Sequence, residues 1–471
     1  MPKRIEREYG ICTTNTGDSF RRMLRLLNEH GAQGLDVSNI KFAPSMRCGS
    51  SLGCFAAKPF SEGEVIFSIP RSLMFGLNQC IDSPASRLLR VFDSARLTSE
   101  LLIWIGMVQH RENPSSHFYH YFNSLDRVSP SPMCWPVELL NALAETNIKP
   151  SLDGARKALL RHFDLIVAAH AYYKAAGDVG ACRLLDPSLL SLDALSWARG
   201  TYLSRRYPGK LGLEVSVPLG CLDGREDGLG GIGVLIPVLD ILNHDSSHDY
   251  LLLQVSNSGL GSDRSPCTRN GEHFLQVICQ RACGAGEELF SNYGRMGNEQ
   301  LLFAFGFAID HNEHETVAVR PRLPPSMLWS GVHSLGTHLV KRGGFSSVPP
   351  LLWKALGLCC GRNEFASAFI DAELGLDQYG GDDKGEVEVG LDEIEALCHF
   401  ASNKLSALKM SDERALEITD ANATEYKMEC SSIVAYRRGQ EEVLSALVEE
   451  LAALLEEGEG EGEGEGQRSI D

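Results

Sequence analysis

The distribution of apolar and polar residues divides the chain into β-like and helical stretches. Residues 18–30 place their apolar side chains on one helical face, with Asp18 at the N-cap position. Short β-like runs follow, and residues 64–69 alternate between apolar and polar until Pro70 ends the run. We therefore expect one helix and then a small group of strands in this part of the chain.

Helical spacing dominates from residue 84 to about residue 196. Apolar residues between Leu101 and Val108 form one face of an amphipathic helix, and a long helix is expected from Asp153 to Lys174. Residues 191–207 form another helical segment, and the Gly-rich stretch 209–233 has no periodicity, as in a surface loop. These patterns predict a large helical insertion between β-like segments.

Beta-like segments return after this insertion. Strands are expected at residues 235–245, 251–255, 273–280 and 287–292, with a hairpin loop between the middle two. A helix then begins near residue 299 and breaks at Gly306.

From about Asp310 the chain is predicted to be helical again. Helical spacing recurs over residues 326–341, 351–358, 391–410 and 424–455. The Glu- and Gly-rich tail that follows is expected to be disordered, because it has no side chains to bury.

Composition and charge are those of a soluble globular protein. The 471 residues are 43% hydrophobic and 23% charged, and they are enough for two or three domains. The net charge of −18 makes the chain a poor candidate for non-specific nucleic-acid binding and favours basic partners. Fourteen Cys are scattered without metal-ligand spacing, and no signal peptide or membrane-spanning run is evident. We expect a cytoplasmic or nuclear protein without a metal site.

The stretch from Leu235 to Asp245 carries candidate chemistry. Seven of its eleven residues are apolar or Pro, but Asp240, Asn243 and His244 interrupt the run. Buried polar groups are costly unless they find partners, so three of them in a core-like segment indicate a site. A buried strand that simply ends in a turn explains the same pattern. Taken alone, the stretch does not decide between these interpretations.

Motifs elsewhere in the chain resolve this ambiguity by their order. Together with the polar stretch they resemble the SET-domain methyltransferases of the Rubisco large-subunit methyltransferase type, a group that includes the actin-histidine methyltransferase. The resemblance covers residues 18–308 well and residues 310–455 more weakly. Its motifs are Leu52-Gly53-Cys54-Phe55-Ala56, Ser204-Arg205, Pro237-x-x-Asp240-x-x-Asn243-His244, Gly286-Glu287-Glu288-x-Phe290-x-x-Tyr293-Gly294, Asn298 leading to Phe305-Gly306-Phe307, and the helix at 435–444.

The resemblance implies an α+β fold. A SET fold of small curved β-sheets with knot-like threading would span residues 34–308 and contain a helical insertion at about 84–196. Residues 1–33 would form a helical lead-in, residues 310–455 an all-α substrate-binding domain, and residues 456–471 a disordered tail. In such a fold the segment bearing Tyr293 passes beneath a loop near Asn243-His244, an exception to the usual rule against threading.

The resemblance also implies roles for individual residues. Tyr293 matches the catalytic tyrosine, whose hydroxyl orients the acceptor nitrogen and the methyl group. Asn243 and His244 match the pair that holds the methyl donor. The remaining matches are Gly53 and Phe55 in the turn that lines the donor, and Arg205 and Asp240, which face each other near it. An Arg–carboxylate pair can equally be structural, as can His244.

Three aromatic residues match positions beside the acceptor channel. Tyr207 and Tyr250 are placed there by the resemblance, and Phe305 stands where the family often has Tyr. One hydroxyl is therefore missing near the channel, which leaves the number of methyl groups transferred undecided.

The function implied is S-adenosylmethionine-dependent methylation of a lysine in a non-histone protein that docks on the C-terminal helical domain. A histidine acceptor is an alternative within the same chemistry, and nothing in the sequence decides between the two. A SET-derived binding module without turnover is a further alternative, which the joint retention of Tyr293, Asn243, His244 and Gly53 disfavours. We expect a monomer that binds neither nucleic acid nor membrane.

Overall fold

The chain folds into two compact units. The structure is a computed structural model that describes residues 15–45, 52–207, 232–245, 251–256, 273–322, 335–362, 365, 387–460 and 468–469. The first unit comprises residues 1–134 and 155–295, and the second comprises residues 135–154 and 296–471. Each unit has its own core and is described separately.

Small antiparallel sheets form the β part of the first unit. All of its strand pairs that the structure describes within sheets are antiparallel. In hydrogen-bonded order the strands are β1 (Ile40–Pro44), β2 (Leu52–Ala56) and β8 (Glu288–Leu289) in one sheet, β3 (Val65–Pro70), β7 (Phe274–Cys279) and β6 (Leu251–Ser256) in another, and β4 (Arg206–Tyr207) with β5 (Val234–Leu235).

The alternation of buried and exposed side chains predicted for residues 64–69 is wrong in strand β3. Its residues from Ile66 to Pro70 are all buried, so both faces of the strand are covered. Ser68 pairs with Gln33 in an isolated bridge, while the other edge of β3 pairs with β7. A strand buried on both faces loses the period-two pattern because no side of it contacts water.

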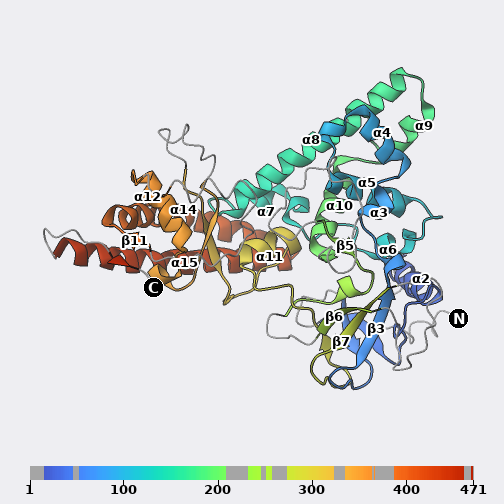
Figure 1. Cartoon of the computed structure of the whole chain (residues 1–471), viewed down its shortest axis with the longest axis horizontal. Helices are drawn as coiled ribbons and strands as arrows, with labels where there is room; N and C mark the ends of the chain where they lie inside the picture. The colour runs from blue at the N-terminus through green and yellow to red at the C-terminus, as the bar shows by residue number, and fades with distance from the viewer. Residues whose placement is uncertain are drawn as a thin grey trace. The chain divides into compact units, whose positions relative to one another are not determined.

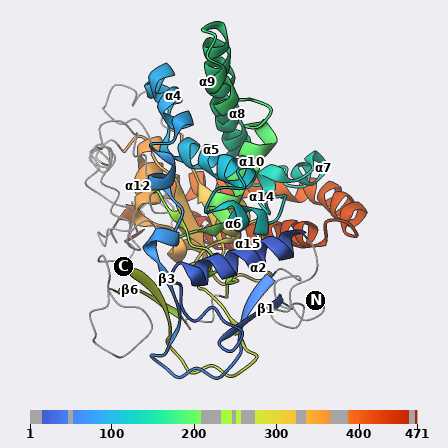
Figure 2. The same ribbon diagram turned by 90° about the vertical axis from the view of Figure 1, so that its right-hand side faces the viewer.

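Helices make up the rest of the first unit. In Figure 1 helix α5 lies among α3, α6 and α10, and all three contact it. In Figure 2 helix α2 lies against α6. The described helices are α2 (Asn15–Glu29), α3 (Leu77–Cys80), α4 (Pro84–Phe92), α5 (Ser99–Glu112), α6 (Tyr119–Ser124), α8 (Ile148–Ala175, from Ala155 onward in this unit), α9 (Val179–Leu184) and α10 (Leu192–Arg205), with 3-10 turns η1 (Arg71–Leu73), η2 (Ser94–Arg96), η3 (Pro132–Cys134) and η5 (Leu239–Ile241).

Two details of these helices differ from the predictions. Helix α5 is not amphipathic: every residue from Leu101 to Val108 is buried, because neighbouring helices cover all its sides. Helix α2 begins at Asn15, so Asp18 lies inside the first turn and is not its N-cap. There Asp18 pairs with Arg21 one turn later.

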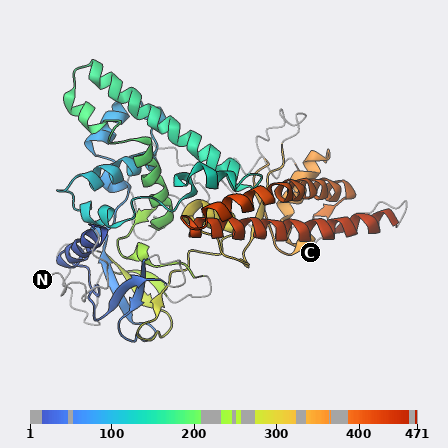
Figure 3. The ribbon, with the colours of Figure 1, turned by 180° about the vertical axis from the view of Figure 1, so that it is seen from behind.

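The second unit is built around an antiparallel pair of long helices. Figure 3 shows α14 and α15 side by side. The core between them and their neighbours includes Trp353, Leu397 and Leu447. The described elements are α7 (Val137–Asn141), α11 (Asn298–Phe305), β9 (Thr316–Val319), β10 (His338–Lys341), η7 (Gly344–Ser347), α12 (Pro350–Cys359), β11 (Glu388–Val389), α14 (Leu391–Asn422), α15 (Lys427–Gly460) and β12 (Arg468–Ser469).

The helices predicted at residues 351–358, 391–410 and 424–455 are confirmed, whereas residues 326–334 of the remaining predicted helix lie outside the described residues. Gly306 ends α11 in a left-handed conformation with φ of 79°, as its position in the sequence predicted. The helical pattern over residues 326–341 is wrong at its end, where β10 pairs with β9 and its side chains alternate between buried and exposed. This part of the chain is therefore mainly helical and carries small two-stranded sheets.

Arg437 links three segments of the second unit. Its Nη1 donates to the carbonyl oxygens of Ala142 and Ala144 at 3.1 and 2.9 Å. Its Nη2 donates to Leu408 O at 2.9 Å, to the Ser411 hydroxyl at 2.7 Å and to Asp412 Oδ1 at 2.6 Å, and Nε donates to the same carboxylate at 2.8 Å. The side chain is 6% exposed, so these carbonyl oxygens have little access to water.

Loss of Arg437 should destabilise the protein far more than loss of its neighbour. We expect Arg437→Met to lower the free energy of unfolding by about 3 kcal/mol or more, because buried acceptors lose their donor. Arg438→Met should cost less than about 1 kcal/mol, since its ion pair with Asp310 is 46% and 55% exposed. Urea denaturation of both variants measures the difference, and equal losses would contradict the role of Arg437.

Candidate active site

The stretch from Ile236 to His244 turns sharply instead of continuing as a strand. Only Val234–Leu235 pair as β5, so the strand predicted for residues 235–245 is wrong beyond its first residue. Pro237 has no backbone N–H to donate, and Val238 adopts a φ of 75° and ψ of −47° before η5 begins. Positive φ is strained for a β-branched residue, at a cost of order 1–3 kcal/mol. In this turn the carbonyl groups of Leu239, Asp240 and Leu242 accept hydrogen bonds from candidate site residues.

Two segments distant in sequence pair beside this turn. His244 and Ser291 form an isolated parallel bridge. The Ser291 N–H donates to Asn243 O at 2.8 Å, and the Asp245 N–H donates to Ser291 O at 3.4 Å. The pairing brings Asn243, His244 and Tyr293 together, as the knot-like threading predicts.

Tyr293 contacts this turn through its backbone, its ring and its hydroxyl. Its N–H donates to His244 Nδ1 at 3.1 Å, and the two ring centroids are 5.0 Å apart. Because Nδ1 accepts this bond, it carries no proton. The Tyr293 hydroxyl donates to Leu242 O at 2.8 Å. Tyr293 is therefore fixed at three points against residues 242–244.

Asn243 is held by a residue that the sequence reasoning missed. Its Nδ2 donates to Glu288 Oε1 at 2.8 Å and to Leu52 O at 3.4 Å, while Glu288 Oε2 accepts from the Ser45 hydroxyl at 2.8 Å. An ionised carboxylate only accepts hydrogen bonds, so it fixes which way the Asn243 amide points. A Cβ at Gly53 would lie 2.4 Å from Glu288 Oε1, so a side chain at this position would displace the Glu288 carboxylate from its place beside Asn243.

Arg205 and Asp240 do face each other, and Tyr121 joins them. Arg205 Nη1 donates to Asp240 Oδ2 at 3.3 Å and to Asp240 O at 3.0 Å, and the Tyr121 hydroxyl donates to Oδ2 at 2.8 Å. The Asp240 side chain is 1% exposed. Burial raises the pKa of its carboxyl, while Arg205 and Tyr121 act in the opposite direction. Within the described residues, Asp240 Oδ1 has no hydrogen-bond partner.

Two tyrosine hydroxyls and two carbonyl groups make the site rich in oxygen. The Tyr207 hydroxyl donates to Leu239 O at 3.0 Å, beside the bond from Tyr293 to Leu242 O. Burial raises the pKa of the Tyr207 hydroxyl far above its usual value, and nearby Tyr293 adds to this. Tyr207 therefore stays protonated at neutral pH and acts through hydrogen bonding instead of as a base.

The other predicted positions contribute less to this geometry. Phe55 is half-buried in β2 and pairs with Lys41 and Glu288 in the sheet. Tyr250 lies outside the described residues. Phe305 is the last residue of α11 in the second unit, so its place beside a channel stays a prediction. The part of the chain that the structure describes contains no group of three or more potential metal ligands. It also contains no helix long and apolar enough to cross a membrane.

Known proteins resemble this chain over most or part of its length. Actin-histidine N-methyltransferase of Gallus gallus is 20% identical over 452 residues, which cover 93% of this chain and 69% of that protein. Ribosomal lysine N-methyltransferase 1 of Saccharomyces cerevisiae is 25% identical over 230 residues, or 44% of this chain and 35% of that protein. No protein-family model matches the chain.

Solved structures resemble it in fold. The SET domain of LSMT bound to lysine and AdoHcy matches with a TM-score of 0.62 and 17% identity over 94% of this chain and 92% of that one. Rubisco LSMT bound to AdoMet matches with a TM-score of 0.61 and 17% identity over 93% and 92% of the two chains.

The chain is related to the SET-domain protein methyltransferases. Its mixed α+β architecture is that of the Rubisco LSMT SET domain followed by helices, and the expected fold class is confirmed. Glu288 and Tyr121 are the candidate site residues that sequence reasoning missed. Glu288 belongs to the Gly286-Glu287-Glu288 motif, but only its partners show which Glu turns inward. Tyr121 belongs to the aromatic run at 117–122, which gives no sign of a distant acidic partner.

Removal of the cation beside Asp240 should make stability depend on pH. Without Arg205, the folded-state pKa of Asp240 rises further above that of the unfolded chain, so the folded protein retains a proton that the unfolded chain releases. Stability then falls as pH rises through this window. We expect Arg205→Met to cost about 3 kcal/mol at pH 8 and clearly less at pH 5.

Urea denaturation at the two pH values tests this expectation. The double variant Arg205→Met/Asp240→Asn should lose the pH dependence, because no buried carboxyl remains to titrate. A loss of equal size at both pH values in Arg205→Met would show that the pair acts by packing alone.

Proposed function

We propose that the chain is an S-adenosylmethionine-dependent protein N-methyltransferase that acts on a lysine of a non-histone protein. The observation that carries this proposal is the pairing of residues 243–245 with Ser291, which joins Asn243, His244 and Tyr293 beside oxygen-bearing groups. The relatives support it, since the matched SET domain of LSMT is bound to lysine and AdoHcy.

The residues of the site fit a sulfonium methyl donor. When bound, S-adenosylmethionine supplies an electrophilic methyl group on a positively charged sulfur. The carbonyl groups of Leu239 and Leu242 and the hydroxyls of Tyr207 and Tyr293 offer oxygen atoms suited to such a charge. In our proposal Asn243, His244, Gly53 and Phe55 hold the donor, and Arg205 with Asp240 fixes the wall beside it.

The chain's own residues must align the acceptor and keep it neutral. The transfer forms a nitrogen–carbon bond and breaks the carbon–sulfur bond, whose electron pair stays on sulfur. A lysine acceptor must first lose a proton, which costs about 4.6 kcal/mol at pH 7 from a reference pKa near 10.4. A narrow, largely apolar channel reduces this cost by desolvating the ammonium group, so no strong base is needed. The Tyr293 hydroxyl then orients the acceptor nitrogen.

A histidine acceptor is the second candidate. It is favoured by the extent of the match to the actin-histidine enzyme, which covers 93% of this chain, whereas the match to the ribosomal lysine enzyme covers 44%. Imidazole has a reference pKa near 6.5 and needs little deprotonation, but it needs a polar partner to fix its tautomer. In either case we propose that residues 310–455 dock the substrate protein.

Tyr293→Phe should separate chemistry from binding. The ring and backbone contacts of Tyr293 remain in this variant, so donor binding measured by calorimetry should change less than about twofold. Methyl transfer should slow by about 100-fold, because the orienting hydroxyl is lost. Mass spectrometry of lysate proteins methylated by the wild type but not by Tyr293→Phe identifies the acceptor as lysine or histidine. Full activity of this variant would remove the role proposed for Tyr293.

Glu288→Gln should weaken donor binding through Asn243. The new amide offers either a donor or an acceptor, so it no longer fixes how Asn243 points, and we expect a loss of about tenfold in affinity. Glu287→Gln is the matched control, because it removes the same charge from a neighbouring side chain that is exposed. Calorimetry measures the affinity of each variant for S-adenosylmethionine. In an Asn243→Ala background Glu288→Gln should have no further effect, and an additive loss would show that Glu288 does not act through Asn243.

A further inference from the structure

Basic side chains are concentrated in one helical part of the first unit. Residues 84–97 and 155–185, which contain α4, η2, most of α8 and α9, carry eight Lys and Arg but only three Asp and Glu. The whole chain has a net charge of −18. A positive region on an acidic protein is a local feature that steers particular partners to it.

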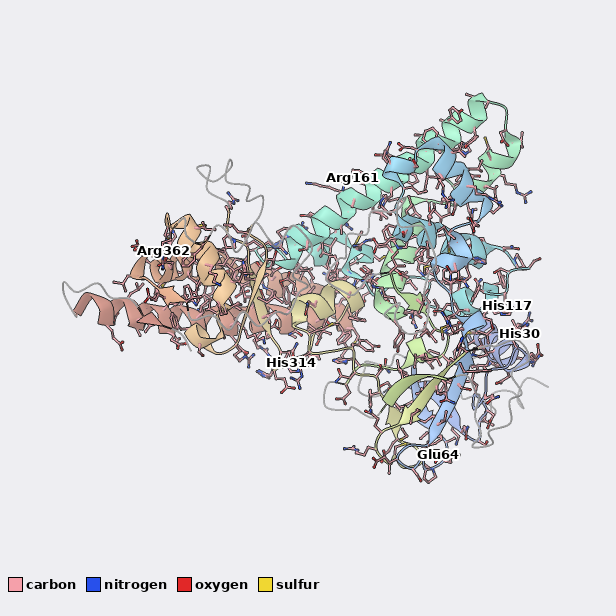
Figure 4. The ribbon with its side chains drawn as sticks, viewed as in Figure 1. His30, Glu64, His117, Arg161, His314 and Arg362 are labelled. Carbon is pink, nitrogen blue, oxygen red and sulfur yellow. The ribbon has the colours of Figure 1, made fainter. Side chains whose placement is uncertain are left out.

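The exposed face of α8 is both basic and apolar. Exposed residues recur along it at intervals of three and four and cover a wide arc of the helix. Lys157 and Arg161 lie one turn apart on one side of this arc, and Lys174 lies on its other side, about 140° of helical rotation from Arg161. Figure 4 shows the Arg161 side chain extending away from the helix. Between the cations lie Leu160, 45% exposed, and Val167, 40% exposed. Asp164 is the one acidic residue of α8 beyond Ala155.

The cations on this face lack acidic partners. Among the described residues, none of Lys157, Arg161 and Lys174 has an Asp or Glu oxygen within 4 Å. Lys157 and Arg161 are four residues apart, where like charges repel across one helical turn. An acidic ligand would relieve this repulsion.

The pKa of His162, which neighbours Arg161 in α8, also reflects the positive charge of this region. Burial lowers the pKa of His162 to about 4, and the guanidinium groups of Arg161, Arg199 and Arg96 act in the same direction. Arg96 pairs with Asp93 at 3.8 Å. Three elements, η2, α8 and α10, therefore contribute cations to one region of the first unit.

The end of this helical region is apolar and well anchored. The Tyr173 hydroxyl donates to Leu88 O at 2.9 Å, and the rings of Tyr172 and Phe92 lie 5.5 Å apart, so α8 is fixed to α4. Tyr172 is nevertheless 57% exposed, and Val91 and Val179 are each 81% exposed. Exposed apolar side chains on a preformed surface can be buried by a partner without first being ordered.

We propose that the exposed face of α8, together with the apolar end formed with α4 and α9, binds an acidic segment of another protein that also carries apolar side chains. We call this surface the basic arm; it comprises Lys157, Leu160, Arg161, Val167, Tyr172, Lys174, Val91 and Val179. The proposal does not depend on methyl transfer.

Charge and spacing favour a protein segment over a nucleic acid. Lys157 and Lys174 are seventeen residues apart, which is about 26 Å along a helix. Three cations over that length are sparse for a polyphosphate backbone, whereas a protein segment can present apolar side chains as well as acidic ones. Each exposed ion pair adds only about 0.2–1 kcal/mol, so the apolar residues must supply the remaining affinity.

The test measures binding of a defined acidic peptide to the full-length protein. The probe is a fluorescein-labelled 18-residue peptide of about twelve Glu with Leu at helical spacing, and fluorescence anisotropy reports its binding. We expect Lys157→Glu/Arg161→Glu to weaken binding by at least about tenfold. The matched control is Arg25→Glu/Lys41→Glu, which reverses two exposed cations elsewhere in the first unit and should change affinity less than about twofold.

A second variant tests the apolar contribution without changing charge. Val179→Ser/Tyr172→Ser should weaken binding of the leucine-containing acidic peptide several-fold. Binding of a leucine-free poly-Glu peptide should not change, because that peptide buries no leucine side chains. Circular dichroism shows whether the charge-reversal variant is folded. If it is not, the Val179→Ser/Tyr172→Ser variant still tests the proposal.

Several outcomes would overturn the proposal. Equal losses in the two charge-reversal variants would indicate non-specific attraction. Tighter binding of an 18-nucleotide single-stranded RNA, lost in Lys157→Glu/Arg161→Glu, would assign the surface to nucleic acid. A dimer seen by light scattering and abolished by the same variant would assign it to a second copy of the chain. Absence of peptide binding to the wild type would refute it directly.

Discussion

The pairing of residues 243–245 with Ser291 is the contact on which the candidate site depends. Its backbone hydrogen bonds, at 2.8 and 3.4 Å, join segments that are almost fifty residues apart. Closing such a loop costs conformational entropy, but one closure places Asn243, His244 and Tyr293 at once. Backbone groups make this connection, and hydrogen bonds of the Asn243, His244 and Tyr293 side chains then fix how these residues are oriented. The strained φ of Val238 at the start of the turn belongs to the same arrangement.

Each unit uses a guanidinium to satisfy backbone oxygens, and its side chain is 21% exposed in the first unit and 6% exposed in the second. Arg205 donates to the carbonyl and carboxylate of Asp240, and Arg437 donates to three carbonyl groups and to Asp412. The planar fork of arginine supplies several donors in fixed directions, which a lysine cannot do. In the first unit this arrangement joins α10 to η5, and in the second it joins α14 and α15 to the segment after α7.

Prediction from sequence succeeded where one periodic pattern ran for several turns. The long helices α8 and α15 were expected within five residues of their observed ends, since each exposes one face and buries the other. The start of α14 was also expected at residue 391, but this helix continues twelve residues beyond its predicted end at residue 410. The helix α5 and the strand β3 were also predicted, but the exposed face expected for each was wrong, because neighbours bury these elements on all sides.

The sequence by itself determined that polar residues in an apolar stretch mark a site, and its ordered motifs named Asn243, His244 and Tyr293 as members. These residue types are recognisable because burying them without partners is costly. Only the tertiary structure decided who those partners are. Glu288 orients Asn243 and Tyr121 binds Asp240, through hydrogen bonds between residues that are 45 and 119 positions apart. Such bonds depend on distances of about 3 Å in the folded chain, and no spacing along the sequence encodes them.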